Sequence, residues 1–128
     1  MRRVVSTGGF EEVGGYARAV RVGDVIAVSG TAATGEGGAA LYPGDAYGQT
    51  REAFLRALSA LAELGGDMGD VIRTRIYLAP EADWRSSVDA HRELFGETPP
   101  ANTTLFVAGL IPEGALVEVE LDAVAQIT

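Results

Sequence analysis

The fold of this chain is decided near its C-terminus, by the stretch PANTTLFVAGL at residues 100–110 and the stretch LVEVE at residues 116–120. We predict that residues 103–107 and 116–125 form the last two strands of a sheet, because both are rich in β-branched and apolar residues. Apolar residues and carboxylates alternate along the second strand, which is the pattern of a strand that buries one face. The buried face carries Val117, Val119, Leu121 and Ala123, and the other face carries Glu118, Glu120 and Asp122.

Three further strands are predicted upstream of this pair. Residues 17–22 and 25–29 are β-branched runs on either side of Gly23-Asp24, so we predict that they form a hairpin. Residues 71–78 also alternate and are predicted to form a strand. One face of that strand carries Ile72, Thr74, Ile76 and Leu78, and the other carries Arg73, Arg75 and Tyr77.

Two segments between these strands are predicted to be helices. Residues 46–64 carry apolar residues at helical spacing after Asp45, a favourable N-cap, and before Gly65-Gly66, which favours a helix end. A second helix is expected to start at Asp83 and to run through Phe95. Its apolar stripe comprises Trp84, Val88, His91 and Phe95, of which we expect Trp84 and Phe95 to lie in the core.

Length and composition fit one domain over residues 1–128, in an α+β architecture with the helices on one face of the sheet. Hydrophobic residues make up 47% of the chain, which is typical of a globular protein. A formal net charge of -8 disfavours nucleic acid and anionic membranes as partners. The chain has no cysteine and one histidine, so we expect no metal site. It has no long apolar run and no segment that resembles a signal peptide, so we expect a cytoplasmic protein without a membrane partner.

The polar face of the predicted sheet allows two interpretations. Three carboxylates at alternate positions of one strand repel one another in a dry environment, so they need water, arginine partners or a functional cleft. Arg73 and Arg75 lie on the corresponding face of another strand. The first interpretation is ion pairing across strands or between subunits. The second is a polar cleft that holds a substrate, with a carboxylate as the base and an arginine as the anchor.

Several short motifs occur in an order and spacing that resemble one known family. They are GYARAVRVG at residues 15–23, VSGT at 28–31, DVIRTRIYL at 70–78 and the C-terminal stretch quoted above. Over nearly its whole length the chain resembles the reactive intermediate deaminase family, also called the Rid or YjgF-like family. Older labels for this family include a ribonuclease activity, which the acidic charge of this chain disfavours.

The resemblance implies a fold and a reaction. The implied fold is like that of chorismate mutase, a mixed six-stranded sheet with two helices packed on one face. The implied assembly is a homotrimer with three clefts between neighbouring subunits, each holding a small-molecule ligand. Archetypal members hydrolyse imines or enamines such as 2-iminobutanoate to 2-oxo acids and ammonia, and they need no cofactor.

The resemblance also implies a set of site residues. Tyr16 matches the tyrosine of the family's cleft, and Ser29 and Gly30 match a pair whose backbone helps to hold the ligand. Glu118 matches the glutamate proposed to position or activate water. Four positions differ from the archetype: Thr31 replaces glutamine, Asp89 asparagine, Thr104 cysteine, and Asn102 the arginine that binds the substrate carboxylate.

The change at Asn102 has the largest expected effect. Arginine offers a bidentate, permanently charged clamp, whereas asparagine offers one neutral amide. The lost charge-assisted bonds correspond to about 1.5–3 kcal/mol, which is one to two decades in affinity. The sequence therefore predicts that hydrolysis of 2-iminobutanoate is weak or absent.

Two further residues keep alternative roles at this stage. Arg75 is the best replacement anion anchor, and the alternative is a salt bridge inside the trimer. His91 is either a core histidine bonded to the backbone or a general base.

Three functions remain open from the sequence. The first is a cofactor-free hydrolase, like an imine or enamine deaminase, acting on a small metabolite in a cleft between subunits. The second is a non-catalytic trimer that binds a small metabolite. The third is a protein-interaction role for the trimer surface. The retained Glu118 favours the first function, and the missing arginine favours the second.

Overall fold

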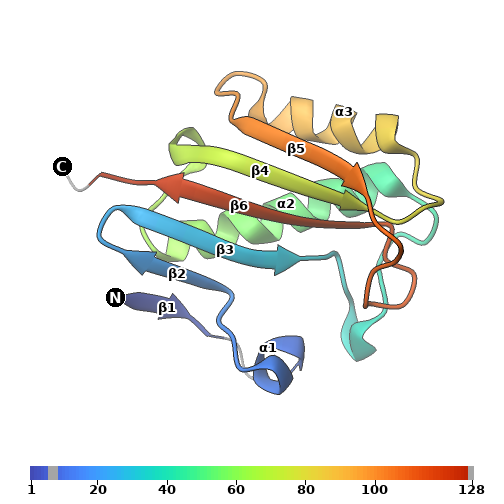
Figure 1. Cartoon of the computed structure of the whole chain (residues 1–128), viewed down its shortest axis with the longest axis horizontal. Coiled ribbons are helices and arrows are strands. Elements are labelled where there is room, and N and C mark those ends of the chain that lie inside the picture. Colours follow the sequence, from blue (N-terminus) through green and yellow to red (C-terminus); the bar gives the residue numbers. More distant parts are fainter. Residues whose placement is uncertain (6–8, 127–128) are drawn as a thin grey trace.

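A computed structural model describes residues 1–5 and 9–126, and it contains one six-stranded sheet with two long helices on one face (Figure 1). The strand order is β1-β2-β3-β6-β4-β5. All neighbouring strands are antiparallel except β4 and β5, which are parallel. The predicted α+β fold with a mixed six-stranded sheet and two helices on one face is confirmed. The elements are β1 Arg2–Val4, α1 Gly9–Gly14, β2 Ala19–Val22, β3 Val25–Thr31, η1 Glu36–Gly38, α2 Ala46–Glu63, η2 Met68–Asp70, β4 Val71–Leu78, α3 Trp84–Phe95, β5 Ala101–Phe106 and β6 Val117–Val124.

The two long helices begin where the sequence predicts. The Asp45 carboxylate accepts a hydrogen bond from the backbone N–H of Gly48 at 2.9 Å and so caps α2. The Asp83 carboxylate accepts from the backbone N–H groups of Arg85 and Ser86 at the start of α3. Gly65 ends α2 with a φ of 88°, a left-handed conformation that favours glycine.

Strand β6 lies in the middle of the sheet and confirms the predicted alternation. The four apolar residues predicted on its buried face are fully buried under the helices, and its three carboxylates lie half-buried on the opposite face. Apolar side chains from α2, chiefly Phe54, Ala57 and Leu61, complete the core on the helix side. The sheet therefore has one dry face and one polar face.

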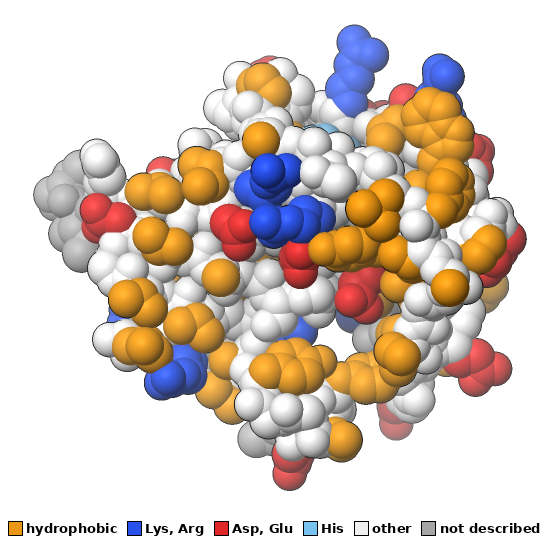
Figure 2. All heavy atoms as spheres, in the orientation of Figure 1, with side chains coloured by type: hydrophobic (Ala, Val, Ile, Leu, Met, Phe, Trp, Pro, Cys, Tyr) orange, Lys and Arg blue, Asp and Glu red, His pale blue; other side chains and the backbone are white. Residues whose placement is uncertain are grey.

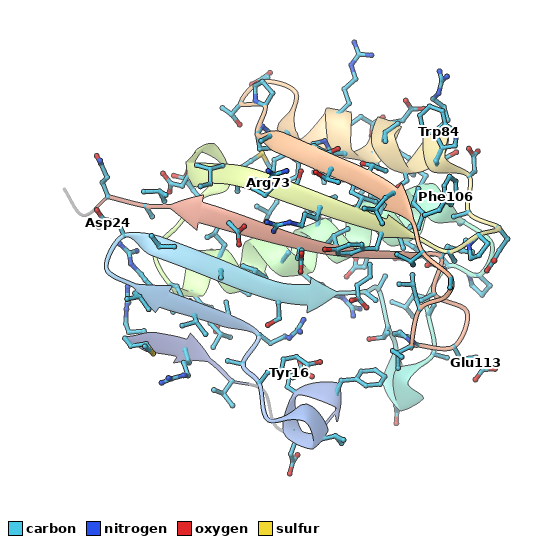
Figure 3. The ribbon with its side chains drawn as sticks, viewed as in Figure 1. Tyr16, Asp24, Arg73, Trp84, Phe106 and Glu113 are labelled. Carbon is cyan, nitrogen blue, oxygen red and sulfur yellow. The ribbon has the colours of Figure 1, made fainter. Side chains whose placement is uncertain are left out.

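Two sequence-based predictions about side-chain direction are wrong. Ile72 is 53% exposed, because a register shift between Val71 and Arg73 interrupts the alternation of β4 and turns this residue away from the core. Trp84 is 46% exposed, because it starts α3 at the open edge of the sheet beside Phe106 (Figure 3). Phe95, at the other end of the same helix, is buried as predicted.

Arg21 is a buried arginine that joins three elements. Its guanidinium donates hydrogen bonds to the carbonyl oxygens of Gly23, Leu64 and Ala125 at 2.8, 2.7 and 2.5 Å. Leu64 follows α2 and Ala125 follows β6, so this one side chain binds carbonyl oxygens at the ends of both elements, and the Leu64 oxygen accepts a second bond from Arg2 at 3.1 Å.

Two short elements near the N-terminus escaped the sequence analysis. Strand β1 pairs with β2, and α1 lies beside the end of β3, where it forms one wall of a hollow (Figures 1 and 2). Of the helices in the described part of the chain, none is both long enough and apolar enough to cross a membrane.

Candidate functional site

An open cavity of about 500 Å³ lies on the polar face of the sheet, between α1, β3 and β6. Helix α1 and the residues after it supply one side, and the loop before β6 supplies Ile111 and Pro112. Tyr16 lies between α1 and the sheet (Figure 3). The polar groups of the lining are Glu11, Tyr16, Arg18, Ser29, Thr34, Glu118 and Glu120.

Glu118 projects from β6 into this cavity and lies against Gly30. A Cβ atom on Gly30 would come within 2.6 Å of Oε2 of Glu118, so the carboxyl group can lie there only because residue 30 has no side chain. The pairing register between β3 and β6 shifts between Val28 and Thr31. The two residues in between, Ser29 and Gly30, line the cavity. The sheet irregularity and the glycine together create the space that the carboxyl group occupies.

The pKa of Glu118 is raised above its ordinary value. Burial is the largest cause, because it disfavours the charged form. The positive charge of Arg18 acts in the opposite direction, and the negative charge of Glu120 adds to the effect of burial. Among the described residues, the Glu118 carboxylate has no hydrogen bond or ion pair. A half-buried carboxyl with a raised pKa and free lone pairs is suited to accept a proton.

Arg18 is a residue of this cavity that the sequence analysis missed. Its Nε atom lies 2.6 Å from Oε1 of Glu11, and its two terminal nitrogens donate to Oγ1 of Thr31 and to the carbonyl oxygen of Gly30, at 3.0 and 2.9 Å. Its guanidinium also lies 5.8 Å from the centre of the Tyr16 ring. The available signal was spacing: Arg18 is two residues after Tyr16, and alternate residues of an extended segment share a side.

Four of the predicted site residues meet at this cavity, and a fifth lies beside it. Tyr16, Ser29, Gly30 and Glu118 line the cavity. Thr31 is buried next to them, where its hydroxyl donates to the carbonyl oxygen of Ser29 at 2.8 Å and accepts from Arg18. Thr31 therefore supports the cavity from beneath and does not line it.

Asn102 and Thr104 lie elsewhere, on the edge strand β5. Asn102 pairs in register with Thr74, which is buried on the helix side of the sheet, and its amide donates to Oγ1 of Thr74 at 3.1 Å. Thr104 donates to Oδ1 of Asn102 at 2.9 Å, and both residues line a second cavity of about 380 Å³ that also includes Trp84. These two side chains and Glu118 are thus on opposite faces of the sheet in one chain.

His91 and Asp89 belong to the helix layer. Nε2 of His91 lies 2.7 Å from Oγ1 of Thr74, and the imidazole packs against Phe54 and Phe95 with ring centres 5.4 and 4.8 Å apart. Burial lowers the pKa of His91, so the neutral imidazole is favoured. Asp89 is exposed on α3. Neither residue lines the Glu118 cavity.

Arg75 lies on the polar face but outside the cavity lining. Its Nη1 atom lies 3.0 Å from Oδ2 of Asp122 and 3.5 Å from Oε1 of Glu120. The hydroxyl of Tyr77 donates to the same oxygen of Glu120 at 2.6 Å. Figure 2 shows a group of arginine side chains at the centre of this face, flanked by carboxylates. Arg75 is therefore connected to the cavity only by its ion pair with Glu120, which is itself a lining residue.

The described residues hold no group of three or more His, Cys, Asp or Glu side chains arranged for a metal ion. The chemistry that the Glu118 cavity itself offers is proton transfer by one carboxyl, next to a guanidinium and the backbone of Ser29 and Gly30.

Comparisons with known proteins agree with this fold. The family model described as Endoribonuclease L-PSP matches residues 9–125. An uncharacterized protein of Streptomyces coelicolor is 45% identical over 124 residues, which are 96% of this chain and 91% of that protein. The 2-iminobutanoate/2-iminopropanoate deaminase of Mus musculus is 30% identical, over 97% of this chain and 92% of that protein. A solved structure of a Mycobacterium tuberculosis protein, described as a member of the YjgF/YER057c/UK114 family, has a TM-score of 0.85 and 38% identity, and covers 97% of this chain and 98% of that one.

Proposed function

The chain belongs to the Endoribonuclease L-PSP family, the Rid or YjgF-like family, and on that basis we propose that it is a cofactor-free hydrolase of a small imine or enamine. The observation that carries this proposal is Glu118. Its carboxyl group is half-buried in a cavity, has a raised pKa and lies against the glycine that makes room for it. This is the environment of a group that can take and return a proton during a reaction.

The proposed reaction needs only water and Glu118. The carboxylate removes a proton from a water molecule while the water oxygen forms a bond to the imine carbon, and the π electrons of the C=N bond move to nitrogen. The carboxyl then returns the proton to that nitrogen, which gives a neutral carbinolamine. The Glu118 carboxylate next takes the proton of the carbinolamine hydroxyl as the C=O bond forms, and delivers it to the nitrogen as the C–N bond breaks, so ammonia leaves and the carboxylate is restored. An enamine enters the same route after it tautomerises to the imine.

We further propose that the working site is a cleft between copies in a homotrimer. The residues that resemble the family's site lie on opposite faces of the sheet in one chain, so Glu118 of one copy can meet Asn102 and Thr104 only if a second copy supplies them. A cyclic trimer, in which each interface joins two different surfaces, provides three such clefts.

The substrate is proposed to differ from that of the archetype. Asn102 stands in place of the arginine, and its amide is engaged by Thr74. Hydrolysis of 2-iminobutanoate should therefore be weak or undetectable. The second candidate function, a trimer that binds a small metabolite without turnover, is favoured by the same observation.

Turnover of imines formed in situ tests the proposal. An amino-acid dehydratase or an amine oxidase can generate a panel of imines, and ammonia release above the spontaneous rate can be followed. We expect acceleration for at least one imine, its loss in Glu118→Gln, and its retention in Glu113→Gln, which removes an exposed carboxylate outside the cavity. Ligand binding without acceleration of any imine would favour the second candidate.

A further inference from the structure

We propose that the Glu118 cavity selects a compound whose C=N group is cationic or neutral and which carries no carboxylate. A protonated imine of a simple amine or an amidine-like compound fits this description, whereas a 2-imino acid does not. This inference rests on the proposed function, because it names the chemical class of substrate for the same site.

The charges around the cavity favour a cation. Three carboxylates, those of Glu11, Glu118 and Glu120, border it together with one guanidinium, that of Arg18. The Arg18 guanidinium forms an ion pair with Glu11 at 2.6 Å and donates to Thr31 and to the Gly30 carbonyl oxygen. Its charge is already compensated by Glu11, and its two terminal nitrogens hold the cavity wall together. An anionic substrate would therefore enter a site with an excess of negative charge.

A second cation near the cavity is compensated in the same way. Arg75 lies between Asp122 and Glu120, at 3.0 and 3.5 Å, so a substrate carboxylate would have to displace a carboxylate of the protein. The edge of β5, which we propose closes the cleft from a second copy, offers neutral groups at Asn102 and Thr104. Arg73 donates to Thr103 and has no ion pair among the described residues, so it is the cation that a test has to include.

Glu118 also lacks a donor that a cationic ligand would supply. Its carboxylate is half-buried, and the described residues give it no hydrogen bond. Its oxygens are reached by solvent, so an N–H group of a cation can replace water there with a charge-assisted bond. The Tyr16 and Phe10 rings beside it provide apolar contact for a small organic group.

Three isosteric probes separate charge from shape: acetamidinium, acetamide and acetate carry one positive, no and one negative charge. Binding to the full chain can be measured from the amide NMR shifts of Ser29 and Gly30. We expect acetamidinium to bind about fivefold or more tightly than acetate, with acetamide between them. Acetamidinium binding should weaken as the pH falls through the raised pKa of Glu118, with Arg18, Glu11 and Glu120 as the charged groups that also face the ligand.

Variants decide whether the preference comes from Glu118. Glu118→Gln should abolish the preference for the cation, and Glu113→Gln should keep it. The inference would be overturned if acetate bound most tightly of the three probes and if that binding were lost in Arg73→Gln or Arg75→Gln. It would also be overturned if no probe shifted the amide signals of Ser29 and Gly30. Imine hydrolysis without a charge preference would overturn this inference alone. If the protein preferred acetamidinium but hydrolysed no imine, the proposed reaction would be wrong and the proposed class of ligand would still hold.

Discussion

At the scale of single residues, the site depends most on the contact between Gly30 and Glu118. The carboxyl group occupies the space where any side chain at position 30 would begin. The backbone of Gly30 is not in the left-handed region, so an alanine there can adopt the same conformation. The glycine is therefore needed for the position of the carboxyl group and not for the path of the chain.

Gly30→Ala should displace the Glu118 carboxyl and leave the fold intact. We expect hydrolysis to fall by about tenfold or more, since misplacing a general base costs much of its contribution. Thermal unfolding should change little, because the displaced atoms are the end of a flexible side chain. Gly109→Ala is a matched control, since a Cβ there meets no atom within 4 Å. Equal activity of the two variants would contradict the role of the contact.

Arg18 should control the ionisation of Glu118. Its charge lowers the pKa of Glu118 against the effect of burial, so Arg18→Gln should raise that pKa further. Arg18→Lys keeps the charge but loses the paired donors to Thr31 and Gly30, so its Glu118 pKa should stay nearer to that of the unchanged protein. A carboxyl ¹³C titration by NMR measures all three values, and a lower pKa in Arg18→Gln would refute this role.

Glu118 should also cost stability at neutral pH. A carboxyl whose pKa is higher in the folded than in the unfolded state binds more protons when folded, so it favours folding at low pH and opposes it once ionised. Glu118→Gln should therefore raise the Tm at pH 7, and the increase should shrink toward pH 4. Calorimetry at both pH values tests the sign, and a decrease in Tm at pH 7 would contradict it.

At the scale of elements, Arg21 ties the ends of α2 and β6 to the β2–β3 turn through three carbonyl oxygens. Arg21→Met keeps much of the side-chain volume and removes every donor, leaving the buried Ala125 carbonyl without a side-chain partner and the Leu64 carbonyl with only its bond from Arg2. We expect a loss of about 3 kcal/mol in the free energy of unfolding. Denaturant titration measures it, with the exposed Arg51→Met on α2 as the control, and equal stability of the two variants would contradict this account.

Elements that carry their own pattern were predictable from the sequence. The alternation of β6 and the aspartate caps of α2 and α3 depend on neighbouring residues, so local reasoning located them. Strand β1 has only three residues and exists because β2 pairs with it, and Ile72 is exposed because of a bulge that no local pattern reveals.

The site was also predictable only where it depends on local sequence. Tyr16 and Glu118 follow from motifs, whereas the separation of Asn102 from Glu118 depends on strand order and on the face to which each residue points.

At the scale of the whole molecule, the polar face of the sheet is proposed to lie inside a trimer. It carries ion pairs of Arg75 with two carboxylates, together with apolar side chains such as Ile72. Light scattering should give a mass of about three chains, as expected for a closed cyclic assembly. A stable monomer at micromolar concentration would remove the shared cleft.

Complementation between two inactive variants tests the central claim most directly, namely that Glu118 of one copy works in a cleft closed by β5 of another. Glu118→Gln removes the base, and Thr104→Trp fills the β5 side. Each variant alone should be inactive. In trimers formed by co-expressing both, random assembly leaves roughly a quarter of the clefts with both halves intact, so about a quarter of the full activity should return. Activity of the mixture no higher than that of the separate variants would contradict a site shared between copies.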